Sequence, residues 1–113
     1  MSKAPRLTHR LTLEAPVRSP DGAGGAQEAW TTLGVLWAEV TPRSGRDADV
    51  GRAPTARMVY RITTRGAPAG HPERAWPGQR FRDGARLFHI YAVSERDPDG
   101  RYLTILAHEE VVQ

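Results

Sequence analysis

Apolar and polar residues alternate with a period of two through most of the chain, and this pattern predicts β-strands rather than helices. The first clear case is residues 6–16, where polar positions Thr8, Arg10, Thr12 and Glu14 alternate with the less polar ones. One face of this segment carries Leu7, His9, Leu11, Leu13 and Ala15. We therefore predict a half-buried first strand that ends at Pro16, because proline cannot donate to a strand ladder.

The same alternation returns along the rest of the chain. The further predicted strand segments are 26–33, 35–42, 57–65, 80–95 and 101–111. Gly34 separates the second and third strands and predicts a bend or a bulge. The pair Asp83-Gly84 favours a tight turn within 80–95, and residues 97–100 form another turn. Both faces of the strand around Phe88–Val93 are apolar, which predicts a central strand.

These elements predict an all-β fold: a small β-barrel or sandwich of six to seven mostly antiparallel strands with a long loop after the third strand. That loop, residues 43–57, has no apolar stripe and contains Val50 as its one bulky aliphatic residue. Long loops of this kind are often functional or disordered. A second loop, residues 66–79, is rich in proline and glycine.

The length of 113 residues predicts one domain with a modest core. The absence of cysteine excludes disulfides and thiolate metal sites and fits a reducing cytoplasm. The chain contains no apolar run long enough to span a membrane as a helix, and residues 1–10 lack the apolar core of a signal peptide, so we expect no membrane association and no secretion.

Charge is distributed unevenly. Residues 43–86 hold ten arginines against four acidic residues, a net charge of +6, while the remainder of the chain has a net charge of −3. This distribution has two interpretations. The arginines line a surface that meets a polyanion or the carboxylates of a partner, or their number simply reflects a GC-rich genome.

No catalytic constellation is present in the sequence. We find no phosphate-binding loop, nucleophile elbow or dinucleotide fingerprint, and the histidines do not have metal-ligand spacing. We therefore expect no enzyme activity, no cofactor and no metal. Tryptophans on strands are most often core residues, which we expect of Trp30 and Trp37, whereas Trp76 lies in a loop and is a candidate interface anchor. The aromatic and basic residues at Tyr60–Arg61 and at 80–82 meet the pattern of a nucleic-acid platform only loosely.

The chain resembles the head-tail joining family of tailed bacteriophages, also called head-closure or stopper proteins. The segments that carry the resemblance cover nearly the whole sequence. They are "LTHRLTLEAP", "RSPDGAGGAQEAW", "LWAEVTPRSGRD", "RMVYRITTR", "GQRFRDGARLFHIYAVSE" and "RYLTILAHEEV".

The resemblance implies a single β-barrel head-closure domain over residues 1–113 that assembles with itself into a ring of six or twelve copies. The ring would lie in the neck of a phage, prophage or gene transfer particle, after assembly in the bacterial cytoplasm. Its implied partners are the portal or an adaptor ring on one side and the tail terminator or tail tube on the other. Packaged double-stranded DNA would be retained behind it without sequence recognition.

The resemblance also implies that loop 43–57 projects into or around the channel. Its candidate channel-facing or DNA-facing residues are Arg43, Arg46, Asp47, Asp49, Arg52 and Arg57. These charges could instead form ion pairs between subunits or keep the loop soluble. The candidate partner-interface residues are Asp21, Gly22, Gly24, Gly25 and Trp76. An alternative for the whole chain is a free-standing nucleic-acid-binding β-barrel.

Overall fold

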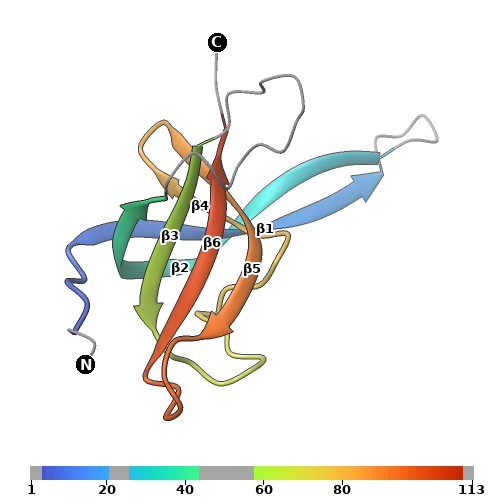
Figure 1. Cartoon of the computed structure of the whole chain (residues 1–113). Coiled ribbons are helices and arrows are strands. Elements are labelled where there is room, and N and C mark those ends of the chain that lie inside the picture. Colours follow the sequence, from blue (N-terminus) through green and yellow to red (C-terminus); the bar gives the residue numbers. More distant parts are fainter. Residues whose placement is uncertain (1–3, 21–25, 44–57, 111–113) are drawn as a thin grey trace, which may run out of the picture.

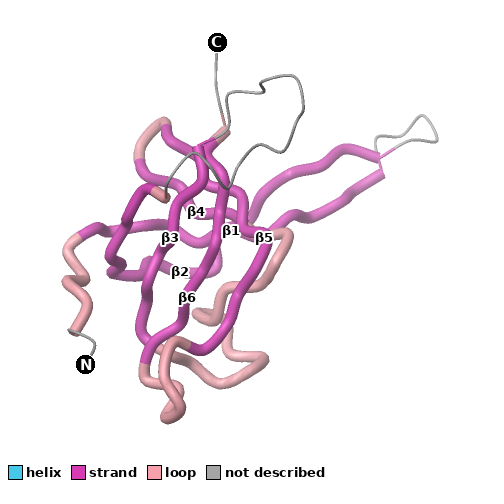
Figure 2. Tube along the Cα trace, viewed as in Figure 1, coloured by secondary structure: helices cyan, strands magenta, loops and turns pink. Residues whose placement is uncertain are grey.

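The computed structural model describes residues 4–20, 26–43 and 58–110, and its regular structure consists of six strands (Figure 1). The strands are β1 (His9–Pro20), β2 (Ala26–Pro42), β3 (Met58–Arg65), β4 (Arg80–Asp83), β5 (Arg86–Glu95) and β6 (Tyr102–Glu109). The described part of the chain contains no helix, and so none that could cross a membrane (Figure 2). The all-β prediction is confirmed, with six strands.

The six strands close on themselves in the order β1-β2-β3-β6-β5-β4, and every pair is antiparallel. The closing contact is short: β4 pairs with β1 only between Thr12 and Glu14. Closure removes the open sheet edges that a small β-protein would otherwise expose. The barrel interpretation is therefore correct, and the sandwich alternative is not.

The core is built from the alternating apolar positions that face the inside of the barrel. It includes Leu103 and Ile105 of β6, and both are fully buried. The other fully or nearly fully buried apolar side chains are Leu11, Leu13, Ala38, Ile62, Ala75, Phe81, Phe88, Ile90 and Ala107. His9 was expected to share the core-facing stripe of β1 but is exposed.

The sequence predicted that the first strand ends at Pro16, but this prediction is wrong. β1 continues to Pro20, and Pro16 pairs with Trp30 of β2. Beyond Glu14, β1 has no second neighbour among the described residues, so one of its edges can accommodate a residue that lacks an N–H. The result is a two-stranded arm, residues 15–20 and 26–32, that extends away from the barrel (Figure 1).

The predicted second and third strands are one continuous strand, β2, with a bulge beside Gly34. Leu13 pairs with Gly34 and Glu14 with Thr32, which leaves Leu33 as the extra residue. A bulge bends a strand and increases its twist. The predicted bulge is therefore present, and it marks the place where the arm leaves the barrel.

A second bulge explains the two apolar faces of β5. The register of β5 against β6 shifts between Ile90 and Ala92, so Tyr91 is the extra residue. Phe88 and Ile90 face the core before the bulge, and Val93 packs against it afterwards. The strand is not buried on both faces; its core-facing side changes at Tyr91, which is 46% exposed.

The proline-rich segment 66–79 packs against the barrel. Ala75 in it is 1% exposed, and Arg74 donates a hydrogen bond from Nη1 to the carbonyl oxygen of Ala67 (2.9 Å). Gly66 lies so close to the turn at Gly100 that a Cβ would meet the Gly100 carbonyl oxygen at 1.9 Å. This close approach requires glycine and ties the segment to the β5–β6 turn.

Candidate assembly surfaces

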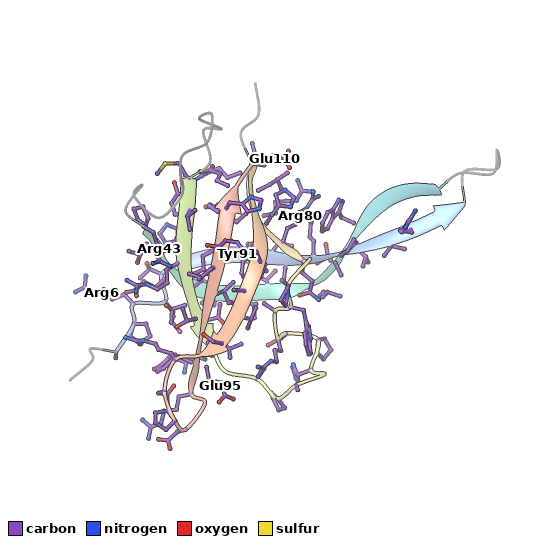
Figure 3. All side chains as sticks on the ribbon, turned by 45° about the vertical axis from the view of Figure 1, so that its right-hand side comes forward. Arg6, Arg43, Arg80, Tyr91, Glu95 and Glu110 are labelled. Atoms are coloured by element: carbon purple, nitrogen blue, oxygen red, sulfur yellow. The ribbon has the colours of Figure 1, made fainter. Side chains whose placement is uncertain are left out.

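The arm is anchored to the barrel by a charged cluster, which we call the arm base: Glu14, Trp30, Arg80 and Arg82. The Glu14 carboxylate accepts hydrogen bonds from Arg80 Nε at 2.6 Å and from Arg82 Nε at 2.9 Å. The side chains of Glu14 and Arg80 are 8% and 10% exposed, whereas that of Arg82 is 43% exposed. Figure 3 shows Arg80 where the arm meets the barrel.

Strand pairing brings these residues together. Thr32, Glu14, Arg80 and His89 are successive cross-strand partners on β2, β1, β4 and β5. Directly opposed residues share one face of a sheet, so Glu14 must meet Arg80. Trp30, two residues from Thr32, lies with its ring centroid 4.0 Å from the Arg80 guanidinium carbon. This stacked contact covers the ion pair on its arm side.

The arm base also shifts the pKa of its carboxylate. Burial by itself would raise the pKa of Glu14, but the hydrogen bonds from Arg82 and Arg80 and their positive charges lower it below its ordinary value. Glu14 is therefore ionised over the whole neutral range. The sequence predicted a polar, outward-facing position here and did not indicate burial.

A second cluster lies at the end of the barrel from which residues 43–57 depart; we call it the rim cluster and define it as Tyr60, Arg86, Phe88 and Glu109. Arg86 donates from Nε and Nη2 to Glu109 at 2.8 and 3.1 Å and from Nη2 to the Tyr60 hydroxyl at 3.2 Å. Its guanidinium carbon lies 4.9 Å from the Phe88 ring centroid. The hydrogen bond from Arg86 lowers the pKa of Glu109.

The rim cluster adjoins the start and the end of loop 43–57. The backbone N–H of Arg43 donates to the carbonyl oxygen of Val59 at 2.9 Å, so the last residue before the undescribed segment is held to β3. Met58, the first residue after it, pairs with Glu109 of the cluster. The two ends of the loop are thus held side by side on neighbouring strands, whatever the path between them.

Histidines and aromatic residues form a row on the outer face of β5 and β6. His89 and His108 are cross-strand partners with ring centroids 5.8 Å apart, and Tyr91 stacks on His108 at 5.9 Å. His89 Nε2 lies 2.7 Å from an oxygen of Glu110 (Figure 3 labels Tyr91 and Glu110). No group of three or more histidine, aspartate or glutamate side chains among the described residues is arranged to hold a metal ion.

Most of the predicted site residues lie outside the described part of the chain. This holds for the loop candidates Arg46, Asp47, Asp49, Arg52 and Arg57 and for the turn candidates Asp21, Gly22, Gly24 and Gly25. Arg43 is described and half-buried. Trp76 is 48% exposed, a position open to a partner, and its role as an interface anchor stays a prediction.

The expectation that Trp37 is a core residue is wrong. Its side chain is 54% exposed because it alternates with Ala38, which faces the core. Trp30 is half-buried at the arm base rather than in the core. The loose aromatic and basic pattern at 80–82 does not form a nucleic-acid platform, because Phe81 is fully buried and both flanking arginines bind Glu14.

A hollow of about 260 Å³ lies beside Trp37, between β2 and the segment after β3. We use the term hollow for this surface, which is lined by Val35, Leu36, Trp37, Arg65, Gly66, Ala67 and Glu73. Val35 and Trp37, which are 41% and 54% exposed, supply its apolar surface. The alternation along β2 indicated this outward face, because Val35 and Trp37 lie two positions apart and therefore share the face of the strand that points away from the core.

A family model of phage head completion proteins matches residues 2–110. The chain belongs to this family. The match covers the barrel, the arm and both long loops, and it confirms the resemblance drawn from the sequence. Membership supports a structural role connected with the phage head, and the structural character of the family supports a non-enzymatic one.

The solved structures that are similar to this chain include two that match nearly all of it. One belongs to the virion of a native gene transfer agent particle: 46% of residues are identical, the TM-score is 0.80, and the match covers 97% of this chain and all of the other. Protein SF1141 from Shigella flexneri 2a has 22% identity and a TM-score of 0.67, with 96% of each chain covered, and shows the shared fold. No curated protein matches.

Proposed function

We propose that the protein is a structural head–tail connector that forms a ring in the neck of a tailed phage or gene transfer particle. The ring would join the portal or an adaptor ring to the tail terminator or tail tube, and it would retain the packaged DNA. The observation that carries this proposal is the 46% identity, over the full length of the matched chain, to a protein of an assembled gene transfer agent virion.

The architecture supports such a role. Closure gives every strand a neighbour on both sides over at least part of its length. Among the described residues, the arm strands form the longest stretch with a neighbour on one side only. The arm departs from the barrel with an anchored base and is available for contacts outside the subunit, and the two ends of loop 43–57 are held at neighbouring strands. A ring copies each charge around its axis, so that one arginine in each subunit becomes a collar able to meet phosphates without reading sequence.

The first test is the mass of the purified protein in solution, alone and mixed with the portal, adaptor and tail-terminator proteins of the same particle. We expect a ring-sized complex with those partners. A protein that ignores them and binds DNA as a monomer, with affinity that falls steeply as salt rises, would instead be a nucleic-acid-binding barrel.

The second test addresses the loop. Deletion of residues 46–54 should leave the barrel folded and yield particles that lose DNA or fail to join tails. Replacement of Arg46, Arg52 and Arg57 by alanine should weaken DNA retention, whereas the matched control, replacement of Asp47 and Asp49 by alanine, should not. Equal effects of the two sets would argue for ion pairs between subunits, and unfolding of the deletion variant would assign the loop a structural role.

A further inference from the structure

The core-facing stripe of β1 continues beyond the barrel onto the arm. Leu11 and Leu13 are fully buried, Ala15 is half-buried and Val17 is 44% exposed. All four lie on one face because β1 itself has no extra residue; the bulge is in β2. The arm therefore extends this stripe by Ala15 and Val17, which lie opposite Thr31 and Ala29 of β2, and the barrel ends before it can cover them.

The arm also lacks neighbours along its edges. Beyond Glu14 the two strands pair only with each other among the described residues, and an isolated two-stranded hairpin is at best marginally stable in water. Six residues of β1 extend past Glu14, a reach of about 20 Å at ~3.3 Å per residue. The buried ion pair of the arm base holds this projecting ribbon at a defined angle.

The hollow is the second exposed apolar surface, and it lies on the other face of the same two strands. Val35 pairs with Thr12, whose side chain points away from the face that carries Leu13 and Val17. Thr12 and Val17 are also about 16 Å apart along β1, at ~3.3 Å per residue. An arm therefore cannot fill the hollow of its own subunit.

We infer that the arm of one copy packs its Ala15–Val17 face against the Val35–Trp37 hollow of the next copy. This inference rests on the proposed ring and names the contact that would build it. The arm face and the hollow are different surfaces of the same subunit, so a contact between them joins neighbouring copies head to tail. Such contacts close into a ring when the rotation between copies allows it. Trp37 is the residue type that anchors interfaces of this kind.

The size of the hollow favours a protein side chain over a small molecule. At about 260 Å³ it is smaller than the ~300–1,000 Å³ of typical ligand pockets. Its apolar wall suits aliphatic side chains such as Val17 and Ala15, and the charged residues Arg65 and Glu73 at its border can stay in contact with water. A second copy of this chain supplies such side chains on a preformed strand.

The chain contains no cysteine, so cysteine pairs give an unambiguous test. Val17→Cys and Val35→Cys are placed in separate copies that are produced together during particle assembly, and the particles are treated with a short bismaleimide crosslinker. We expect a covalent dimer of this chain, and none from either variant alone. The control pair is Val17→Cys with Met58→Cys, since Met58 is 47% exposed but lies at the base of loop 43–57.

The outcomes separate the inference from the proposed function. Rings that form without this crosslink, or that give as much of it with the control pair, overturn the arm contact and leave the ring intact. A crosslink from Val17→Cys to a different particle protein also overturns it. If no multi-copy assembly forms with the neck partners, the proposed function and this inference both fail. Trp37→Cys replaces Val35→Cys if that variant does not fold, as judged by circular dichroism.

Discussion

The arm and loop 43–57 leave the same barrel, but the charged clusters at their bases lie in different surroundings. At the arm base, a carboxylate and an arginine are both about nine-tenths buried, and the arginine stacks on a tryptophan ring. At the rim cluster, Arg86 is 46% exposed while its partner Glu109 is 21% exposed. The two clusters have similar numbers of side-chain hydrogen bonds, so the difference in burial decides how much each cluster contributes to the stability of the fold.

This comparison shows where the fold depends on charge. Removing one partner of a buried pair leaves the other charge without water or a counter-ion, whereas an exposed partner is simply hydrated. The arm base therefore holds the arm rigidly against the barrel, and we call this buried contact the joint. The rim cluster adds a smaller stabilisation at the end of the barrel, and we call this exposed contact the edge. The following predictions test that difference, beginning with the largest effect.

Glu14→Ala should destabilise the protein by about 3 kcal/mol, because Arg80 would remain buried without its carboxylate. The free energy of unfolding from urea titration measures this loss. Glu14→Gln is the matched control, since it keeps the size and one acceptor oxygen and should lose less. A loss below about 1 kcal/mol for Glu14→Ala would show that water reaches Arg80 and that the joint is not buried in solution.

Acid should weaken the same joint without any substitution. The pKa of Glu14 and that of Glu109 are both lowered by folding, so the stability they contribute is fully present above the pKa of the unfolded chain and is lost as pH falls through the lower, folded pKa. Stability should be level near neutral pH and decline below about pH 5. Unfolding free energies measured across this range should decline less in Glu14→Gln; identical profiles would contradict the assignment.

Arg86→Ala should cost about 1 kcal/mol, less than the change at Glu14, because water screens a guanidinium that is half exposed. The difference between wild type and variant should shrink at 1 M salt, where charges are screened within ~3 Å. The loss in Glu14→Ala should persist at this salt concentration. An equal salt effect on the two variants would remove the distinction between joint and edge.

Trp37→Ala should have the smallest effect on folding, below about 1 kcal/mol, since more than half of the side chain is exposed. The same variant should incorporate poorly into particles if the hollow receives a neighbouring arm. Phe81→Ala serves as the control for a core aromatic and should cost about 3–5 kcal/mol. A comparable loss in Trp37→Ala would mean that this side chain supports the barrel itself.

A pattern in the sequence can predict a structural feature only when that feature depends on residues that are close together in the chain. The alternation that predicted the buried face of β1 is a property of neighbouring residues, and that face is as expected at Leu11 and Leu13. The arm base could not be predicted in this way. Glu14 and Arg80 are 66 residues apart, and only the closing contact between β1 and β4 places them in one row.

The candidate site shows the same limit. The outward position of Trp37 could have been deduced from its alternation with Ala38, but the frequency of buried tryptophans suggested the core instead. The role of Trp76 is likewise open, although its exposure is known. The loop residues Arg46 to Arg57 and the turn residues Asp21 to Gly25 lie outside the described part of the chain, so their roles stay predictions.

The sequence by itself determined the all-β class, the core-facing positions Leu11 and Leu13 of β1 and the places of the loops, because these depend on a period of two and on local turn residues. It also determined the family, through segments spread over the whole chain. Only the tertiary structure decided that β1 passes Pro16, that β2 is one bulged strand and that Glu14 is buried between two arginines. Those features depend on which strands share an edge, and barrel closure settles that question between residues far apart in the chain.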